Sequence, residues 1–335
     1  MLAVVKEKAA PGISIKQISI PKPKKDEVLV KVIYASICGT DIGIYDWIPW
    51  AASHIKPPKI IGHEMVGEVL EVNTKQKTNI RIGDLVSSET HIFCLNCFQC
   101  QIKNYHICEN MQLFGIGRDG AFAQVTTSPL RTTWKNDPAI PVESMSVQEP
   151  LGNAVNAVGK AKVKGKKVLI MGLGPTGLCA GAVAKAYGAK EIVGVNDEPY
   201  RRNLAMKSGW FNRSLDIVNI KEYNSFDVVL EMSGNRLGIK VAFDAVRIAG
   251  TIIAFGIPKE NISIDWGKYL INKELTILSV FGRQLWRTWH QTTDLLKSGR
   301  IDLSKIITHK FKLKDFEKAM KLMKSRKCGK ILLEP

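Results

Sequence analysis

Residues 167–187 read KVLIMGLGPTGLCAGAVAKAY, and this stretch decides the fold. An apolar run suited to a buried strand is followed at once by a turn that matches G-x-G-x-x-G, and then by a helical pattern. Gly172 permits the tight turn, Gly174 lets the backbone approach a pyrophosphate, and Gly177 allows close packing. The helix N-terminus offers free N–H groups to the phosphates. The stretch predicts a dinucleotide site, and a purely structural glycine turn is the alternative.

The residues after the next predicted strand bear on the choice between NAD and NADP. Asn196 stands nineteen residues after Gly177, where this motif expects an acidic residue for the adenosine ribose. Asp197 follows it, and Arg201 and Arg202 stand close by. A carboxylate disfavours a 2′-phosphate, whereas an arginine accommodates it. We expect Asn196, Asp197 and Arg201 to bind the cofactor, which we predict to be NAD, with NADP as the alternative.

Strand and helix patterns alternate from about residue 164 onward. Further strand patterns cover 191–195, 226–231, 251–255 and 275–280. This alternation predicts an α/β domain with a doubly wound parallel sheet. The first 150 residues instead contain β-branched runs at 27–33 and 65–72 between turn signals, which predicts a β-rich domain.

The C-terminal part predicts one further amphipathic helix. Asp315 is the expected N-cap, and Gly329 follows the expected last turn. Apolar residues recur at the i, i+3, i+4, i+7 spacing, at positions 316, 319, 320 and 323. The methionines among them are expected to pack in the core rather than to contact a cofactor.

Length and composition exclude several classes. A chain of 335 residues predicts roughly two domains. Its 45% hydrophobic and 24% charged residues are typical of globular proteins, not of disordered, collagen-like or disulfide-scaffold chains. No apolar run approaches the ~20 residues of a membrane span, and no hydrophobic signal region follows Lys6 and Lys8. We therefore expect a cytoplasmic protein with no membrane partner.

Net charge is the unusual bulk property, at +17 from 48 basic and 31 acidic residues. The basic residues are spread from 22–25 through 160–167 to 310–330, without the interleaved aromatic residues of a single-strand groove. We expect a solvated basic surface with no dedicated nucleic-acid site. A non-catalytic protein that binds RNA is the alternative from another functional class, and salt-sensitive RNA binding would favour it.

Four of the seven cysteines fall within fifteen residues, namely Cys94, Cys97, Cys100 and Cys108. With no predicted secretion signal, such crowding argues for metal rather than for disulfides. Four thiolates complete a closed tetrahedral zinc shell, whose role is structural, and an iron–sulfur cluster is the alternative.

A second set of candidate metal ligands is scattered along the chain. Cys38, His63 with Glu64, and Glu149 offer the mixture of sulfur, nitrogen and carboxylate that holds catalytic zinc with one open position. Spacing alone leaves the alternative that Cys38 is a buried apolar residue and His63 an ordinary histidine.

These features together resemble the zinc-dependent medium-chain alcohol dehydrogenase superfamily, and within it the L-threonine 3-dehydrogenases most. The resemblance is carried by SICGTD (36–41), IYDW (44–47), IKPP (55–58), GHE (62–64), ETHI (89–92), QEPLGNA (148–154), GR (282–283), TW (288–289) and IITH (306–309). It implies a GroES-like catalytic domain of residues 1–149 and 287–335, with a structural zinc lobe at about 90–110, and a Rossmann domain of residues 150–286. It also implies an active cleft between these domains and a homo-oligomer, either a dimer or a tetramer.

The resemblance makes Cys38, His63 and Glu64 the ligands of a catalytic zinc. With the structural site, the chain would then hold about two zinc ions. Glu149 matches a carboxylate that can reach the catalytic metal. Because Cys38 and Glu64 already neutralise the charge of the ion, a permanent bond to Glu149 would weaken the Lewis acid. We therefore expect Glu149 to be an exchangeable ligand or to stand just outside the ligand shell.

The same resemblance makes Thr40 the hydroxyl that relays the substrate proton, Asp41 a partner of the metal ligands, and His91 a residue of the substrate cleft. It also carries over Arg283 as a cofactor-binding residue. The implied reaction is hydride transfer from a secondary alcohol to a nicotinamide cofactor, with L-threonine giving 2-amino-3-oxobutanoate. A polyol or sugar dehydrogenase of the same superfamily is the alternative.

Three departures from the family pattern lie near the expected substrate entrance. Gly43 stands where the family commonly has the histidine of the second relay step. An acidic pair expected after Trp47 is replaced by Ile48 and Pro49, and a glutamate is replaced by Arg287. Without the histidine, the proton must leave through the cofactor ribose or through water.

Overall fold

The computed structural model describes residues 1–335 and divides the chain into two units. Unit 1 comprises Met1–Glu149 and Ile307–Pro335, and unit 2 comprises Pro150–Ile306. No helix in either unit has the length and apolarity that crossing a membrane requires.

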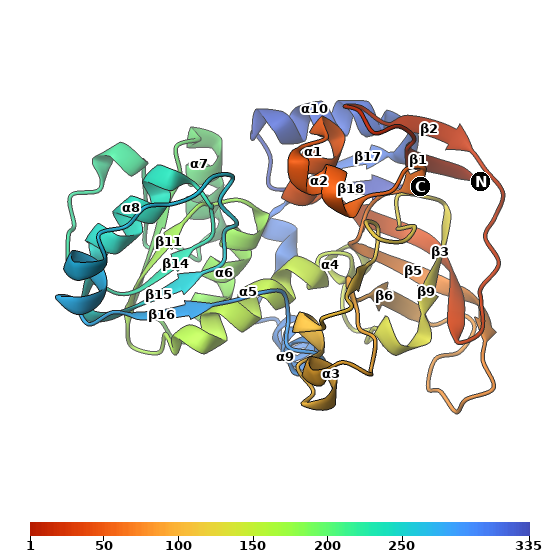
Figure 1. Ribbon diagram of the computed structural model, residues 1–335, viewed down its shortest axis with the longest axis horizontal. Coiled ribbons are helices and arrows are strands. Elements are labelled where there is room, and N and C mark those ends of the chain that lie inside the picture. The colour runs from red at the N-terminus through yellow and green to blue at the C-terminus, as the bar shows by residue number, and fades with distance from the viewer. The chain divides into compact units, whose positions relative to one another are not determined.

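Unit 2 is built around six parallel strands in the order β13-β12-β11-β14-β15-β16. Renumbered within the unit, this is the 3-2-1-4-5-6 order of the doubly wound dinucleotide-binding fold, so the predicted fold class is confirmed. Figure 1 shows helices on both sides of this sheet. The elements are α5 (Gln148–Ala161), β11 (Lys167–Met171), α6 (Pro175–Ala186), β12 (Glu191–Val195), α7 (Pro199–Ser208), β13 (Arg213–Leu215), β14 (Phe226–Glu231), α8 (Arg236–Ala245), β15 (Val246–Ala254), a π-helix (Gly267–Ile271), β16 (Thr276–Ser279) and α9 (Arg287–Lys297).

The register of the parallel strands brings the predicted cofactor residues to one edge of the sheet. Met171 at the end of β11 stands opposite Val195 in β12 and opposite Glu231 in β14. The residues that follow the strands, Gly172 and Asn196, therefore lie next to each other at the carboxyl edge, where doubly wound sheets bind their ligands.

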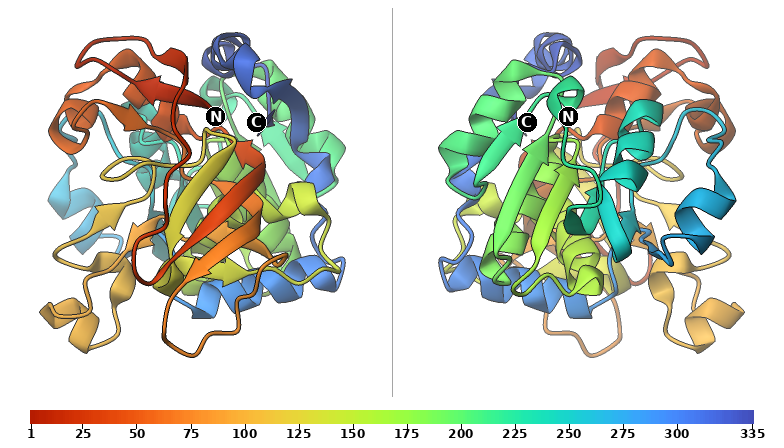
Figure 2. Two further views of the ribbon diagram at one scale, coloured as in Figure 1. Left: turned by 90° about the vertical axis from the view of Figure 1, so that its right-hand side faces the viewer. Right: turned by 90° about the vertical axis from the view of Figure 1, so that its left-hand side faces the viewer.

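Unit 1 contains a seven-stranded mixed sheet in the order β10-β6-β5-β3-β18-β17, with β9 also paired to β3. Figure 2 (left) shows β9, β3 and β5 of this sheet side by side, in yellow to orange-red. A three-stranded sheet β2-β1-β4 and the pair β7-β8 complete the strands. The elements are β1 (Leu2–Lys6), β2 (Ser14–Gln17), β3 (Glu27–Ser36), α1 (Gly39–Asp46), α2 (Pro49–His54), β4 (Lys59–Ile60), β5 (Met65–Asn73), β6 (Leu85–Ser88), β7 (His91–Ile92), α3 (Phe98–Gln101), β8 (Gln112–Leu113), β9 (Val125–Pro129), β10 (Thr133–Lys135), α4 (Val142–Met145), β17 (Ile307–Lys312), α10 (Phe316–Ser325) and β18 (Lys330–Glu334).

The predicted tail helix is α10, and its apolar face packs as expected. The four apolar positions 316, 319, 320 and 323 are all at most 2% exposed, so the methionines are core residues. Asp315 is the N-cap of this helix, as predicted, whereas the predicted end of the helix differs from the structure. Asp315 makes no capping hydrogen bond and pairs with Lys318 instead, and the helix ends before Arg326, which adopts φ +64, rather than near Gly329.

The return of the chain to unit 1 differs from the boundary that the resemblance implies. The resemblance implies that the chain re-enters the catalytic domain at residue 287. In the structure, unit 2 extends to Ile306. The segment that contains α9 remains in unit 2 because it is tied to the rest of that unit. Its Lys305 donates to the carbonyl of Ser208 at 3.0 Å and lies over the ring of Trp210.

Candidate active site

Two antiparallel strands of unit 1 bring the scattered ligand candidates together. β3 ends two residues before Cys38, and β5 begins at Met65, directly after His63 and Glu64. Because Ala35 stands opposite Met65, the end of β3 lies beside the beginning of β5. One ligand atom each of Cys38, His63 and Glu64 consequently lies within 4.8 Å of the other two.

This cluster fits a metal ion because it leaves a buried carboxylate oxygen without a protein partner. Glu64 is fully buried, yet its Oε1 makes no hydrogen bond. An unsatisfied buried polar group costs roughly 1–3 kcal/mol. Sulfur, imidazole and carboxylate are also the donors of catalytic zinc sites. The residues present therefore fit a zinc ion.

Asp41 links the loop of Cys38 to the imidazole of His63. One carboxylate oxygen accepts the backbone N–H of Cys38 at 2.8 Å, and the other lies 3.7 Å from Nδ1 of His63. Burial raises the pKa of Asp41 to about 6, against the opposing charge of His63. Burial lowers the pKa of His63, but the charges of Asp41 and Cys38 outweigh it and raise that pKa. A metal ion bound to the ring would displace the proton. A carboxylate in this position orients a ligand histidine.

Thr40 and Glu149 border the cluster without belonging to the three residues that form it. Sγ of Cys38 lies 3.8 Å from Oγ1 of Thr40. Glu149 is 7% exposed and accepts the hydroxyl of Thr90 at 3.0 Å, and its charge contributes to the raised pKa of His63. Thr90 stands inside the ETHI stretch, but the sequence interpretation did not single it out.

His91 is buried and held by a carboxylate two residues earlier in the chain. Its backbone N–H and its Nδ1 both contact Oε1 of Glu89, at 2.9 and 2.8 Å. Glu89 is fully buried and was also missed from the sequence. These contacts fix the orientation of the His91 imidazole.

Two further residues that the sequence interpretation missed contact Glu64. Lys330 forms an ion pair with Glu64 and donates to the carbonyl of Ile37 at 3.0 Å. The hydroxyl of Ser36 donates to the same carboxylate. The expectation that Lys330 belongs to a solvated basic surface is wrong, because this side chain is 1% exposed. Its place at the head of the apolar run KILL was the available signal.

The four clustered cysteines also converge on one point. Their sulfur atoms lie within 4.8 Å of one another, and none of them forms a disulfide. The sulfurs of Cys97 and Cys108 are 3.8 Å apart, which is about the spacing of thiolates bound ~2.3 Å from a tetrahedral zinc. The backbone N–H of Asn96 lowers the pKa of Cys94 to about 6, whereas burial raises the pKa of Cys108 to about 12. A metal ion shared by the four sulfurs would hold them all as thiolates. This lobe fits a structural zinc.

In unit 2, the glycine turn has the shape that a pyrophosphate requires. Gly172 has φ +98, and a Cβ on Gly177 would lie 1.9 Å from the carbonyl oxygen of Gly172. Both positions therefore exclude a side chain. A Cβ on Gly174, the N-cap of α6, would meet only the guanidinium of Arg201, at 3.7 Å. Arg201 thus lies beside the glycine turn at the beginning of α6.

The residues expected at the ribose are held by bonds within unit 2. The side-chain oxygen of Asn196 accepts the N–H of Glu198 at 2.9 Å. Arg202 donates to the carbonyls of Asn196 and Asp197 at 2.7 and 2.9 Å and pairs with Asp216 at 2.9 Å. Arg202 is thus engaged by the protein, and Arg201 is the arginine beside the glycine turn.

Arg283 is buried and bonds to the beginning of α5. It donates to the side-chain oxygen of Asn153 at 2.8 Å, and its Cδ lies 2.7 Å from where a Cβ on Gly152 would be. These contacts connect the segment before α9 to α5. They explain why this part of the QEPLGNA stretch carries a glycine and an asparagine.

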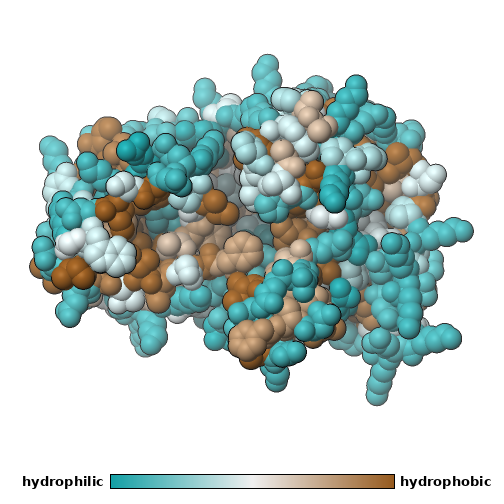
Figure 3. Space-filling model, in the orientation of Figure 1, coloured by the Kyte–Doolittle hydropathy of each residue, from teal (hydrophilic) through white to brown (hydrophobic).

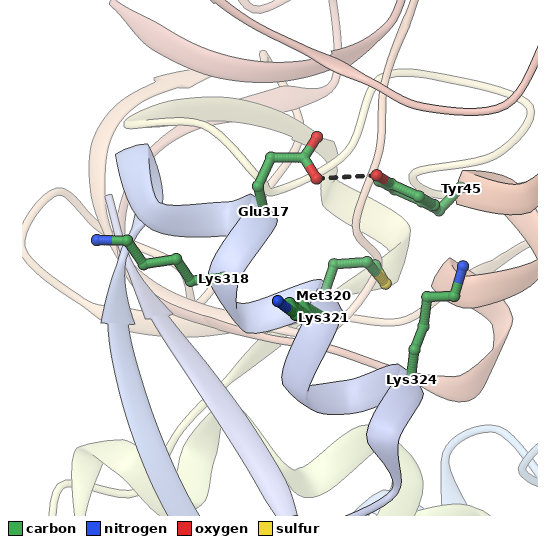
Figure 4. Close-up of a pocket in the computed structure, with 6 residues that line it drawn as sticks. All are labelled: Tyr45, Glu317, Lys318, Met320, Lys321 and Lys324. Atoms are coloured by element: carbon green, nitrogen blue, oxygen red, sulfur yellow. Dashed lines mark hydrogen bonds between the residues drawn. The ribbon is translucent and has the colours of Figure 1, made fainter.

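A surface hollow of unit 1 lies between α1 and α10. Its volume is about 450 Å³. It is lined by Tyr45, Glu317, Lys318, Met320, Lys321 and Lys324 (Figure 4). Tyr45, from the IYDW stretch, donates its hydroxyl to Glu317 at 2.9 Å. Lys324 is paired with Asp46 at 2.7 Å. The side chain of Tyr45 therefore helps to hold α10 in place.

Comparisons with known proteins agree with this geometry. Residues 24–141 match the alcohol dehydrogenase GroES-like domain, and residues 175–298 match the zinc-binding dehydrogenase domain. The chain is 43% identical to the L-threonine 3-dehydrogenase of Pyrococcus abyssi, over 99% of this chain and 98% of that protein. It is 44% identical to the L-threonine 3-dehydrogenase of Caldanaerobacter subterraneus subsp. tengcongensis, over 100% and 99% of the two chains.

A solved structure extends the likeness to the whole fold. A zinc-binding dehydrogenase from Sinorhizobium meliloti 1021, bound to NADP, superposes with a TM-score of 0.89 at 25% identity, covering 100% of this chain and 99% of that one. The family and the two-domain fold class predicted from the sequence are confirmed. The chain belongs to the zinc-dependent medium-chain alcohol dehydrogenase family and is an NAD(P)-dependent enzyme.

Proposed function

We propose that this enzyme oxidises L-threonine at its secondary hydroxyl to 2-amino-3-oxobutanoate, with NAD as the hydride acceptor. The observation that carries the proposal is the buried cluster of Cys38, His63 and Glu64. It occurs in a chain whose relatives at 38–44% identity are L-threonine 3-dehydrogenases. The chain would hold about two zinc ions, one at this cluster and one at the four-cysteine lobe.

Several residues around the cluster would help to remove the proton of the substrate hydroxyl. Cys38, His63 and Glu64 would hold a zinc ion, whose Lewis acidity would lower the pKa of the substrate hydroxyl. Thr40, whose hydroxyl lies 3.8 Å from Sγ of Cys38, would accept the hydroxyl proton. Glu149, which accepts a hydrogen bond from Thr90, would be an exchangeable ligand of the metal ion. Beyond Thr40 the proton would leave through the cofactor ribose or water.

His91 and Asp41 would act as holding groups in the same proposal. Asp41 would keep the imidazole of His63 in a single orientation, since its carboxylate lies 3.7 Å from Nδ1. His91, held by Glu89, would present the second ring nitrogen to the substrate. A group whose own rotamer is held in this way places a substrate more precisely than a mobile one.

NAD is proposed over NADP because Arg202, one of the two arginines near the expected ribose site, is already bonded within the protein. Arg202 is engaged by Asp216 and by backbone carbonyls, so it is not available to pair with a 2′-phosphate. Arg201, beside Gly174, would meet the pyrophosphate instead. Asn196 lacks the charge that would repel a 2′-phosphate, so the preference for NAD is expected to be modest.

The substrate is tested by comparing L-threonine, 2,3-butanediol, sorbitol and glucose in one kinetic panel. L-Threonine presents an ammonium and a carboxylate beside its hydroxyl, and a site that pairs both charges rejects substrates that lack them. The highest kcat/KM is therefore expected for L-threonine. The departures at Gly43, Ile48, Pro49 and Arg287 favour the polyol alternative. Activity on sorbitol or glucose with none on L-threonine would establish that alternative.

We also propose that the enzyme is a homo-oligomer, either a dimer or a tetramer. β16 is an edge strand of the unit 2 sheet, and its open side is a template for pairing. Ile271, Ile277 and Phe281 are 65%, 39% and 50% exposed near it. Figure 3 shows hydrophobic side chains gathered at this end of unit 2, at the left of the view. Light scattering should give a multiple of the chain mass, and Ile277→Lys should lower it.

A cytoplasmic location is part of the same proposal. Both metal sites need reduced cysteines, and all seven cysteines are free of disulfides. Thiols are kept in this state in the cytoplasm rather than in secretory compartments. Cell fractionation with an antibody to the protein tests the location.

A further inference from the structure

A buried lysine joins the proposed metal cluster from the far end of the chain. β18 begins at Lys330 and runs antiparallel to β3, with Leu332 opposite Ser36. This register brings Lys330 to the segment that follows β3. There its ammonium donates to the carbonyl of Ile37 at 3.0 Å and pairs with Glu64.

The contact gives the two oxygens of the Glu64 carboxylate different roles. Oε2 is engaged by the ammonium of Lys330 and by the hydroxyl of Ser36. Oε1 is buried without any hydrogen-bond partner. Oε1 is therefore the oxygen of Glu64 that the protein leaves available to a metal ion.

Stability alone does not account for a fully buried ammonium at this place. Replacing a buried ion pair by packed apolar residues is often neutral or stabilising, because desolvating two charges is costly. The charge balance of the cluster offers a reason for the pair. The thiolate of Cys38 and the carboxylate of Glu64 would cancel the charge of a divalent ion, and the ammonium of Lys330 adds a positive charge beside them. Lys330 pairs directly with Glu64, one of the ligand candidates.

We propose that Lys330 is the counter-charge of the catalytic metal site, which keeps the bound ion electrophilic and lowers the affinity of the site for that ion. The inference rests on the proposed function, because it requires a metal at Cys38, His63 and Glu64. Lys330 contacts neither substrate nor cofactor in this role. It acts through Glu64 and through the field of its own charge, which is strong in a buried site.

Zinc affinity tests the proposal directly. Wild type, Lys330→Met and Lys330→Arg are compared by titrating zinc against a chelator of known affinity. Removing a positive charge beside a divalent ion should make Lys330→Met bind the catalytic zinc about tenfold more tightly or better. Lys330→Arg keeps the charge and should bind zinc like wild type. Unchanged or weaker zinc binding by Lys330→Met would overturn the proposal.

The matched control is a second buried lysine that has no carboxylate partner. Lys273 in unit 2 is 8% exposed and donates to the carbonyls of Phe243 and Val246 at 2.6 and 2.9 Å. Lys273→Met therefore loses a buried ammonium without touching the cluster. It should leave zinc affinity unchanged, and an increase like that of Lys330→Met would overturn the proposal.

The pH profile of alcohol oxidation gives a second readout. With a less electrophilic ion, the substrate hydroxyl gives up its proton less readily, so the acid limb of kcat should move to higher pH by about one unit in Lys330→Met. Lys330→Arg should restore the wild-type profile. A purely structural lysine would lower activity in Lys330→Met without moving the limb, and that result would count against the proposal.

Two comparisons keep the test decisive. If Lys330→Met does not fold, Glu64→Gln and Glu64→Gln/Lys330→Met provide the same contrast without an uncompensated buried carboxylate. The double variant should bind zinc more tightly than Glu64→Gln, and equal or weaker binding would overturn the proposal. If Cys38→Ser leaves the zinc content unchanged, the proposed metal site itself is wrong. Unchanged affinity in Lys330→Met beside an intact site rejects only the role of Lys330.

Discussion

The Cδ1 atom of Ile48 lies 2.9 Å from the position that a Cβ on Gly43 would take. Gly43 lies inside α1, and Ile48 is the N-cap of α2. The side chain of Ile48 therefore fills the space beside Gly43 where the family pattern has a relay histidine. The departures from the family pattern at Gly43 and Ile48 are thus coupled, because the two residues pack against each other.

This packing predicts that a histidine at position 43 needs room. Gly43→His alone should lose about 1–3 kcal/mol of stability, because the imidazole displaces Ile48. Gly43→His/Ile48→Ala should recover part of that loss and raise the rate most at low pH, where removing the hydroxyl proton is harder. Thermal unfolding and kcat against pH check both effects, with Ile48→Ala as the control. A full gain from Gly43→His alone would contradict the packing argument.

The second prediction concerns the metal cluster. Cys38→Ser or His63→Ala should abolish turnover, by a factor of about 10³ or more, because each removes a ligand of the site that activates the hydroxyl. The fold and NAD binding should persist, since the nucleotide site lies in unit 2. Circular dichroism, NAD titration and zinc analysis accompany the assay. Near-normal kcat in a variant that has lost its catalytic zinc would show that the mechanism is wrong.

Cys97→Ser should act on stability rather than on the reaction. Loss of one thiolate opens the closed four-cysteine shell, whose metal binding contributes folding free energy. We expect a lower midpoint of thermal unfolding and the loss of about one zinc ion per chain, with the chemistry intact in the remaining folded fraction. Cys179→Ser, at a buried cysteine outside both clusters, is the control. Iron in place of zinc in the native protein would refute the assignment of this lobe.

The fourth prediction concerns cofactor preference. Asn196→Asp should widen the preference for NAD over NADP by about tenfold, because a carboxylate binds the ribose hydroxyls and repels a 2′-phosphate. The new side chain can still accept the N–H of Glu198, so the turn should keep its shape. The ratio of kcat/KM for the two cofactors is the measurement. A wild type that strongly prefers NADP would mean that Arg201 reaches the phosphate.

The fifth prediction is a pH dependence of stability in unit 2. Hydrogen bonds from Arg213 and Lys167 hold the pKa of Glu222 at about 2. Because this pKa is lowered on folding, the contribution is complete above about pH 4.3 and is lost as the pH falls towards 2. The groups are partly exposed, so solvent screening limits the contribution to about 1 kcal/mol.

Glu222→Gln should therefore destabilise the protein by about 1 kcal/mol at neutral pH and by less as the pH approaches 2. Denaturant unfolding at several pH values measures this difference. Glu260→Gln, at an exposed position, serves as the control. An equal effect of Glu222→Gln at pH 7 and near pH 2 would contradict the electrostatic explanation.

The sequence by itself determined the features whose parts are close along the chain. The run of residues 167–187 specifies a strand, a tight turn and a helix, because turn geometry and apolar periodicity are local properties. The parallel sheet follows from repeating that pattern. The four-cysteine lobe was equally accessible, because its ligands lie within fifteen residues and can converge only on one another.

Only the tertiary structure decided what surrounds the proposed catalytic metal. Cys38 meets His63 and Glu64 through the antiparallel register of β3 and β5, and Lys330 reaches Ile37 from 293 positions away through that of β3 and β18. Strand order and register are set by the burial of whole sheet faces, which no short pattern encodes. For the same reason a lysine that looked like part of a basic surface is a buried charge beside the metal site.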